Sequence, residues 1–307
     1  MRRILVMNER DLRHPQAGGA EVHCFEVFRR LVAGGDEVTL LSVSFPGAAA
    51  EEWVAGIRVR RLGPRPIYYL RVPAAYRRVR REAPLDVVVE DLNKFPFFAR
   101  LWVREPVVVL AHHLFGRTAF RQVAFPIAAA TVAAEWLVPR LYRGLPVVAV
   151  SASTRDELTR GGLRPTDVRV IPNGLDHAHY RPGPGPRAAS PTVLVLGRVE
   201  PYKRVDLLVD AVAALPGVRL VVAGTGTGLD AVRDGETGLL VRPGDVPALA
   251  AALRRVLEDD GLRERLGAAA LRWAARFTWD GVAVAVSAVL DEARGAVSDR
   301  AAVAGRA

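Results

Sequence analysis

The string LGRVEPYKRVDLLVDAV (196–212) places two cations beside the start of a predicted amphipathic helix. A predicted strand ends at Gly197, and Arg198 and Lys203 follow it. Free backbone N–H groups, the helix dipole and the two side-chain charges together favour an anion at such a position. Lys203 and Lys94 are the only lysines among 43 basic residues, and lysine supplies a compact point charge where arginine supplies a planar fork. The string indicates an anion site, and two solvated surface cations are the alternative.

Two adjacent histidines end a Val-rich run in PVVVLAHHLFG (106–116). Open α/β sheets bind ligands outside the carboxyl ends of their strands, where His112 and His113 are predicted to lie. Consecutive side chains on an extended segment point in opposite directions, so at most one of the two is expected to face a substrate. A packed or merely polar histidine is the alternative. No acids or further histidines at ligand spacing accompany them, so we expect no metal site.

Glycines lie in two further connections that follow predicted strands. In AGGAE (17–21), Gly18 and Gly19 would let a ligand come close to the backbone, although two glycines alone do not define a site. In GTGTG (224–228) the spacing is G-x-G-x-G rather than G-x-G-x-x-G, and no acidic residue closes a βαβ unit. A nicotinamide or flavin site is therefore not expected.

Positive charge is concentrated in residues 57–81, which contain no acidic residue. The segment has Tyr68, Tyr69 and Tyr76 between nine arginines, namely Arg58, Arg60, Arg61, Arg65, Arg71, Arg77, Arg78, Arg80 and Arg81. Such a segment attracts anionic lipid head groups or nucleic acid. The chain has no zinc-finger spacing, RNP-like box or heptad zipper, so we expect no nucleic-acid partner. An acceptor or membrane surface is one interpretation of the segment, and an arginine-rich solvated surface is the other.

The bulk composition is that of a soluble globular protein. Half of the 307 residues are hydrophobic and a quarter are charged, and the chain is long enough for two ordinary domains. The net charge is +10 and the pI about 10.6. The single cysteine, Cys24, rules out an internal disulfide and fits a reducing compartment. The longest apolar run (123–139) contains Pro126 and Glu135 and falls short of a membrane span, so we expect a cytoplasmic protein.

Hydrophobic runs predict an open, doubly wound α/β sheet in the first half of the chain. Val-rich runs that are apolar on both faces are typical of buried parallel strands. Helical segments with apolar periodicity separate several of them, and the first such helix ends at Gly34. Strands are predicted at 2–7, 37–43, 57–62, 85–91, 106–113 and 145–151, with a further strand within 168–176.

A Pro- and Gly-rich stretch, RPGPGPRAASP (181–191), marks a linker after which the pattern restarts. Strands are predicted at 192–197, 219–224 and 238–241, and helices at 202–215, 245–276 and 280–294, with Asp245 as an N-cap. Three strands are fewer than a doubly wound nucleotide-binding domain usually has. We therefore expect the second sheet to be incomplete, and either to pack loosely or to pair with a partner chain.

Taken in order, these strings resemble glycosyltransferase family 4, retaining enzymes of the GT-B fold. The similar strings run along nearly the whole chain: AGGAE, VVLAHHLFG, VAVSASTRDELTRGGL, VRVIPNGLD, LGRVEPYKRVDLLVDAV, VRDGETGLLVRPGD and ARFTWDGVA. VVVEDLNKFPFFARLWVREP also resembles a bacterial subgroup of that family.

The resemblance implies an α/β protein of two Rossmann-like domains that binds a nucleotide-diphosphate sugar and transfers the sugar without a metal cofactor. By position, Arg198 and Lys203 would hold the donor diphosphate and stabilise its departing charge. Gly18 and Gly19 would let the donor phosphate approach the backbone, and His112 would contact the donor sugar. Many family members use lipid-linked acceptors at a membrane surface, which would suit the arginines at 60, 61, 77, 78, 80 and 81 and a peripheral location at the inner face of the membrane.

The chain departs from the family pattern after the strand RLVVAG (219–224). The family's PS…EGFG…EA segment, whose two glutamates hold the donor sugar and ribose, is absent, and GTGTG is followed almost directly by LDAVRDGETGLLV. We therefore predict an acceptor domain (1–181), a linker (182–191), a truncated donor domain (192–280) and a C-terminal crossover helix and tail (281–307). A non-catalytic binding module on the same scaffold is the alternative to a transferase.

Overall fold

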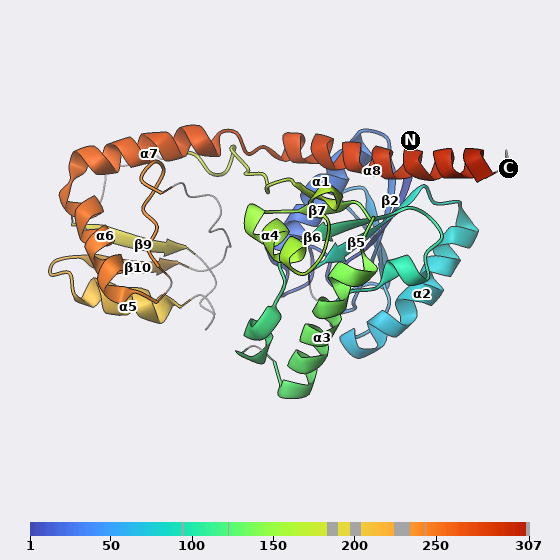
Figure 1. Ribbon diagram of the computed structural model, residues 1–307, viewed down its shortest axis with the longest axis horizontal. Helices are drawn as coiled ribbons and strands as arrows, with labels where there is room; N and C mark the ends of the chain where they lie inside the picture. Colours follow the sequence, from blue (N-terminus) through green and yellow to red (C-terminus); the bar gives the residue numbers. More distant parts are fainter. Residues whose placement is uncertain are drawn as a thin grey trace. The chain divides into compact units, whose positions relative to one another are not determined.

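The computed structural model describes residues 1–93, 95–121, 123–182, 190–196, 204–223, 234–242 and 244–304. The chain divides into two compact units. The first, which we call the N-terminal unit, contains residues 1–174 together with 279–307, and the second contains residues 175–278. Figure 1 traces the elements of both units along the chain.

The N-terminal unit is built on one eight-stranded sheet with the order β3-β4-β2-β1-β5-β6-β7-β8. All neighbours in it are parallel except β3 and β4. The strands are β1 (Arg3–Met7), β2 (Glu37–Ser42), β3 (Glu51–Val54), β4 (Ile57–Arg61), β5 (Val87–Leu92), β6 (Val107–Ala111), β7 (Val147–Ala149) and β8 (Val168–Val170). Every residue of β5 and β6 is buried, which is why β6 is apolar throughout and β5 is interrupted only by Glu90 and Asp91.

Strand β3 was not predicted, and it pairs antiparallel with β4 through a two-residue turn at Ala55 and Gly56. Both turn residues have positive φ, 50° and 79°, which matches the twist of a tight hairpin. Glycine supplies this conformation without strain, but alanine does so rarely, so the sequence carries only half of the usual hairpin signal.

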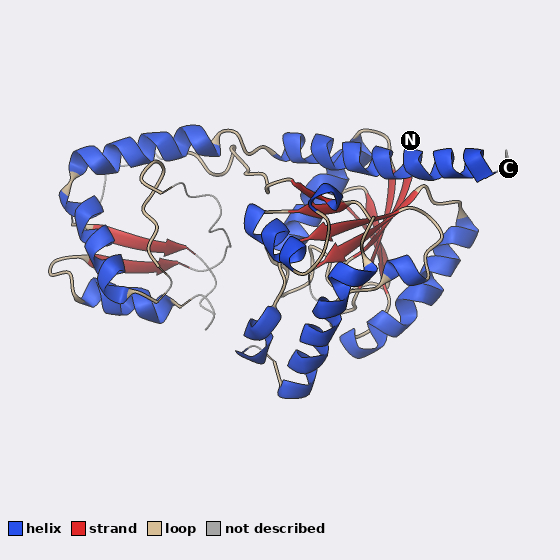
Figure 2. Ribbon diagram, viewed as in Figure 1, coloured by secondary structure: helices blue, strands red, loops and turns tan. Residues whose placement is uncertain are grey.

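Helices cover both faces of this sheet (Figure 2). On one face, α1 (Gly19–Ala33) and α8 (Trp279–Ala304) share a core that includes Phe25, Phe28, Val286 and Leu290. The other face carries α2 (Arg65–Glu82), α3 (Phe125–Leu141) and α4 (Ala152–Arg160), whose inward side chains form a second core. Three 3₁₀ turns complete the unit, at Ala99–Leu101, Gly116–Arg121 and Pro165–Asp167.

A buried arginine fastens α8 to the start of the sheet. The Arg2 guanidinium pairs with Asp36 Oδ2 at 2.5 Å, donates to the backbone oxygen of Ser287 at 3.0 Å, and lies 3.0 Å from Asp291. Arg2 and Asp36 are both buried, so each charge depends on the other for compensation. A groove of about 410 Å³ beside these residues lies at the amino edge of the sheet, between the start of β1, the end of α1 and α8.

In the second unit, the described residues form a two-stranded parallel sheet of β9 (Thr192–Leu196) and β10 (Arg219–Ala223). Its helices are α5 (Val205–Ala213), α6 (Val246–Glu258) and α7 (Asp260–Ala274). The predicted N-cap is confirmed, because Asp245 Oδ1 accepts a hydrogen bond from the backbone nitrogen of Ala248 at 2.9 Å. The strand predicted at 238–241 is wrong: this stretch makes one isolated bridge, between Asp234 and Gly238, and no ladder.

Gly174 brings the chain against the first residue of α8. A Cβ atom at this position would lie 2.5 Å from the Trp279 ring and 2.6 Å from the Trp279 backbone nitrogen. We therefore expect Gly174→Ala to lower the free energy of unfolding by about 1–3 kcal/mol, because either the backbone or the indole must move. Urea unfolding measures this change.

Gly295→Ala is the matched control, because Gly295 lies in α8 and a Cβ atom there would meet nothing within 4 Å. Alanine at a helical position is expected to be neutral or to stabilise by up to about 1 kcal/mol. Equal stability of Gly174→Ala and the parent protein would contradict the close packing at Gly174.

Candidate functional site

Polar side chains gather at the carboxyl edge of the sheet, where β1, β5 and β6 lie side by side. Asn8 follows β1, Asp91 lies near the end of β5, and His112 directly follows β6. Because these three strands are parallel neighbours, their ends meet at one edge and bring the three side chains together. This edge is where open α/β sheets bind ligands. The groove beside Arg2 lies at the opposite edge and does not coincide with this cluster.

His112 lies against a buried carboxylate. Its Nε2 atom is 2.9 Å from Asp91 Oδ1, and both side chains are almost fully buried. The loop that carries the histidine is held by its backbone, since Thr154 Oγ1 donates to the His112 carbonyl at 3.0 Å. The predicted position of His112, at the carboxyl end of a strand, agrees with this geometry, and of the two adjacent histidines only His112 is buried, while His113 is exposed. The carboxylate beside Nε2 fixes the orientation of the His112 ring.

A second histidine, His23 of α1, packs edge-on to His112 with ring centroids 5.0 Å apart and an interplanar angle of 77°. Trp279 lies on it as well, at 5.9 Å. His23 is fully buried, and its two ring nitrogens have no hydrogen-bond partner among the described residues. Burial, together with the nearby His112, holds the pKa of His23 well below its ordinary value. His23 is therefore a neutral ring against which His112 rests.

An amide network connects this cluster to the glycine pair that begins α1. Asn8 Nδ2 donates to Asp91 Oδ2 at 3.0 Å, and Asn93 Nδ2 donates to Asn8 Oδ1 at 3.1 Å and to Glu21 Oε1 at 3.3 Å. The other Glu21 oxygen accepts from the Gly18 backbone nitrogen at 2.6 Å. Gly18 is half-buried and Gly19 is exposed at the first turn of the helix. The Glu21 carboxylate thus occupies one N–H group and offsets part of the helix dipole.

Two buried carboxylates shape the loops that follow β5 and β6. Glu90 accepts from the backbone nitrogens of Phe97 at 2.7 Å and Ala99 at 3.0 Å, and from the Tyr142 hydroxyl. Glu135 accepts from the backbone nitrogens of Phe115 at 2.6 Å and Gly116 at 2.8 Å.

Burial raises the pKa of both carboxyls, and the hydrogen bonds that they accept oppose this rise. Sequence reasoning did not assign a role to either residue. The signal that could have found them is an acidic residue within a Val- or Ala-rich apolar segment, since a carboxyl buried there requires a hydrogen-bond partner.

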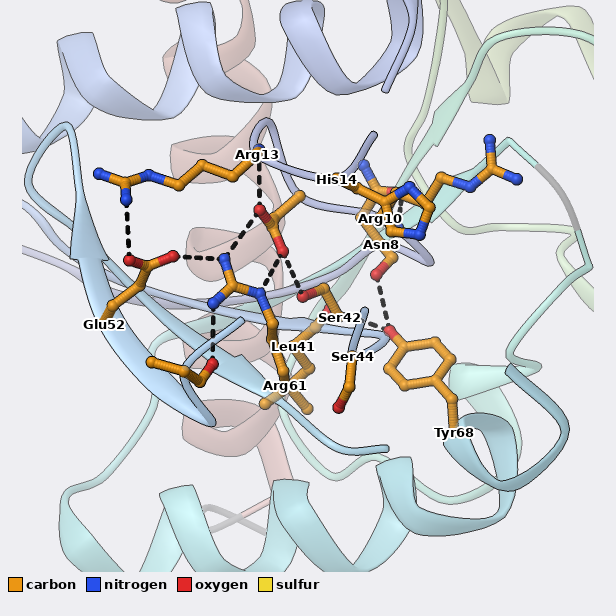
Figure 3. A network of polar contacts seen from close by, with 12 residues as sticks. Asn8, Arg10, Arg13, His14, Leu41, Ser42, Ser44, Glu52, Arg61 and Tyr68 are labelled. Atoms are coloured by element: carbon orange, nitrogen blue, oxygen red, sulfur yellow. Dashed lines mark hydrogen bonds and ion pairs between the residues drawn. The ribbon is translucent and has the colours of Figure 1, made fainter. Parts of the chain in front are cut away.

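A third network fixes the loop that follows β1 (Figure 3). Arg61 forks onto Asp11, with Nε 2.7 Å from Oδ2 and a terminal nitrogen 3.0 Å from Oδ1, and it also pairs with Glu52 at 2.5 Å. Ser42 Oγ donates to Asp11 at 3.1 Å. The Tyr68 hydroxyl donates to the Asn8 carbonyl at 2.8 Å, which holds the other end of the same loop.

The assignment of Arg60 and Arg61 to an exposed acceptor or membrane surface is wrong. Their side chains are 9% and 0% exposed, and Arg60 pairs with Glu51 at 3.1 Å and Glu82 at 2.6 Å. Residues 57–81, from which the surface was predicted, contain no acid, but the unpredicted strand β3 brings Glu51 and Glu52 alongside β4. Both arginines form ion pairs within the N-terminal unit and are not available to an external ligand.

The remaining arginines of the predicted surface, Arg77, Arg78, Arg80 and Arg81, all lie exposed on α2. Arg80 pairs with Glu105 at 2.6 Å, and Arg78 lies 3.4 Å from Glu82.

Arg198 and Lys203, predicted to bind the donor diphosphate, lie outside the described residues, as do Lys94 and the GTGTG string. Within the described ranges, no three His, Cys, Asp or Glu side chains are grouped to hold a metal ion. No helix in those ranges is long and apolar enough to cross a membrane.

The eight-stranded sheet with helices on both faces defines the N-terminal unit as a Rossmann-like α/β domain of the kind found in GT-B glycosyltransferases, which confirms the predicted fold class. The family model described as Glycosyltransferase Family 4 matches residues 17–179, more than half of the chain. The chain belongs to glycosyltransferase family 4.

Solved structures agree on the fold. Sucrose-phosphate synthase from Thermosynechococcus elongatus superposes with a TM-score of 0.77 at 18% identity, covering 96% of this chain and 100% of that one. Anabaena HepE in complex with UDP-glucose superposes with a TM-score of 0.71 at 16% identity, covering 95% and 100%.

Curated relatives match shorter stretches. The gpi3 subunit of phosphatidylinositol N-acetylglucosaminyltransferase from Schizosaccharomyces pombe is 25% identical over 70% of this chain and 50% of its own length. D-inositol 3-phosphate glycosyltransferase from a Nocardioides strain is 47% identical over 24% of this chain and 16% of its own length. The chain spans about half the length, or less, of these curated relatives.

The buried neutral His23 makes a prediction for the pH dependence of stability. Because the pKa of His23 is lowered in the folded protein, only the unfolded chain takes up a proton here as the pH falls through about 6.5. Stability is therefore lost below that pH, by up to about 1.4 kcal/mol per pH unit. Urea unfolding of His23→Phe at pH 7.5 and 5.5 should show a smaller loss between the two pH values than the parent protein shows.

Cys24→Ala is the control, because Cys24 is the next residue of α1, is equally buried, and has a pKa raised well above its ordinary value by burial. It should lower stability by the same amount at both pH values. An identical acid loss in His23→Phe and the parent protein would show that His23 does not titrate as argued.

Proposed function

We propose that this protein transfers a sugar from a nucleotide-diphosphate sugar to an acceptor, with retention of configuration at the transferred carbon. The observation that carries the proposal is the cluster at the carboxyl edge of the N-terminal sheet, where His112 lies 2.9 Å from Asp91 beside the first turn of α1. The chain's membership of glycosyltransferase family 4 supports the reaction class. The complex of Anabaena HepE with UDP-glucose supports a nucleotide sugar as the donor.

In this proposal, His112 contacts the donor sugar and Asp91 keeps its imidazole oriented. Gly18 and Gly19 let the donor phosphate come close to the backbone at the start of α1. Since Glu21 already offsets part of the positive end of that helix, the charge that binds the diphosphate comes from Arg198 and Lys203. These two cations stabilise the negative charge that develops on the departing diphosphate, and no metal ion takes part.

We further propose that the acceptor is lipid-linked and that the protein works in the cytoplasm at the inner face of the membrane. The S. pombe relative is named for transfer to phosphatidylinositol, which supports a lipid acceptor. The exposed arginines of α2 support attraction to an anionic surface.

A non-catalytic binding module is the second candidate. It is favoured by the two-stranded sheet that the described residues of the second unit form, and by the absence from the sequence of the family's segment with two glutamates. Such a module would keep the acceptor-binding N-terminal unit but would bind no nucleotide-sugar donor.

The donor is tested by thermal unfolding with UDP-glucose, UDP-N-acetylglucosamine and GDP-mannose. A donor present at 100 times its Kd should stabilise the fold by about 2.7 kcal/mol. Transfer to a lipid acceptor, followed with radiolabelled donor, should fall about 100-fold or more in His112→Ala, because a group that contacts the reacting sugar is lost.

His113→Ala is the matched control for His112→Ala. This neighbouring histidine is exposed, and its substitution should leave transfer within about twofold. Absence of both a thermal shift and transfer with every donor would overturn the transferase proposal and favour the binding module.

A further inference from the structure

The outer surface of α3 and the turn before it is apolar. Of the twenty large hydrophobic side chains that the described residues expose, six lie between positions 120 and 137: Phe120, Val123, Phe125, Ile127, Trp136 and Leu137. Phe125 is 73% exposed and Trp136 is 60% exposed. A helix on the surface of a globular protein usually turns polar side chains outward, so this arrangement is the reverse of the ordinary one.

The pattern follows one continuous face of the helix. The exposed positions after the first turn recur at helical spacing and contain apolar residues until the last turn: Ala130, Ala133, Trp136 and Leu137, with Arg140 at the end. The Arg140 guanidinium stacks on the Trp136 ring at 3.5 Å. The single acid of α3, Glu135, is buried and binds the backbone of Phe115 and Gly116. The outer face of α3 therefore carries no negative charge.

Helix α2 adds positive charge on the same side of the sheet. Its Tyr68, Val72 and Tyr76 pack in the same core as Val138 and Tyr142 of α3, so the two helices cover one face of the sheet. Outward, α2 exposes Leu70, at 80%, together with Arg71, Arg77, Arg78 and Arg81. Its one acid, Glu82, is engaged by Arg58, Arg60 and Arg78.

We propose that the outer faces of α2 and α3 form a docking surface for an anionic lipid bilayer, in which Phe125, Ile127, Trp136 and Leu137 enter the head-group layer and the arginines of α2 pair with lipid phosphates. Aromatic and aliphatic side chains flanked by arginine, with no acid among them, are the composition of an interfacial helix. The inference rests on the proposed function in one respect, since it names the surface at which a lipid-linked acceptor is met.

Charge favours a bilayer over other occupants. A second copy of the chain placed face to face would oppose one set of arginines to another, because Glu82, the one acid of α2, is already paired within its own chain. A nucleic acid would pair with the arginines but would leave the apolar face of α3 without a partner. An anionic bilayer satisfies both halves of the surface at once.

Co-sedimentation with vesicles tests the proposal. We expect the full chain to bind phosphatidylglycerol/phosphatidylcholine vesicles and to bind phosphatidylcholine vesicles at least about tenfold more weakly. The double variant Phe125→Ser/Trp136→Ser should bind the anionic vesicles at least about tenfold more weakly than the parent chain. Arg77→Glu/Arg78→Glu should weaken binding similarly, and the parent's affinity should fall as salt is raised.

Trp53→Ser is the matched control, because Trp53 is 67% exposed in the same unit but lies on β3. It removes an exposed indole and should leave vesicle binding unchanged. The α3 variants replace exposed side chains, so their unfolding temperature should match that of Trp53→Ser. Tryptophan emission should shift to the blue on vesicle addition in the parent chain and shift less in Trp136→Phe.

The outcomes separate this proposal from the transferase proposal. Loss of vesicle binding in the α3 variants, with the donor thermal shift intact, supports the docking surface independently of catalysis. Vesicle binding that is unaffected by the α3 and α2 variants overturns it, whatever the donor result. A concentration-dependent dimer that the α3 variant dissolves, or nucleic-acid binding that displaces the vesicles, also overturns it.

Discussion

Parallel pairing of β1, β5 and β6 is the constraint on which the candidate site depends. Parallel strands must all end at one edge, so the residues that follow them are brought together although they are far apart in sequence. Asn8, Asp91 and His112 meet for this reason, and α1 begins at the same edge because it follows β1. The strands in turn must be buried on both faces, and α1 with α8 on one side and the helices α2 to α4 on the other provide that cover.

Burying polar groups at this edge costs free energy unless each finds a hydrogen-bond partner, and backbone groups of the adjacent loops supply several of these partners. Glu90 and Glu135 each accept two backbone N–H groups, so each desolvated carboxyl also determines the path of a loop. Asp11 and Arg61 do the same for the loop after β1. His23 is the exception, because its two ring nitrogens are buried without a partner in the described part of the chain, and neutrality limits the cost of this burial.

The parts of the fold that sequence predicts are those with a local cause. Val-rich runs predict β5 and β6, because burial on both faces favours apolar residues along a strand, and a histidine directly after β6 predicts where His112 lies. Strand β3 is not predicted because Ala55 adopts a left-handed turn conformation, and alanine is not a residue that indicates such a turn in a sequence. The error at Arg60 and Arg61 has partly the same origin, since two of their acidic partners, Glu51 and Glu52, reach them only through that hairpin. The strand predicted at 238–241 fails because a short apolar run has no strand beside it to pair with among the described residues.

One arginine-rich segment thus serves two purposes, and the sheet decides which. In β4, the side chains of Arg60 and Arg61 fall beside β3 and the loop after β1, where acids compensate them and burial raises the cost of losing either partner. In α2, the 3.6-residue period turns Tyr68, Val72, Tyr76 and Val79 inward and leaves the arginines between them in solvent. Charge counted along the sequence therefore overstates the cationic surface, and only the helical part of the segment is available to an anionic partner. The arginines of α2 lie on the same side of the sheet as the outer face of α3, which is apolar and carries no exposed acid. These two neighbouring faces, and not the net charge of the chain, favour a lipid surface.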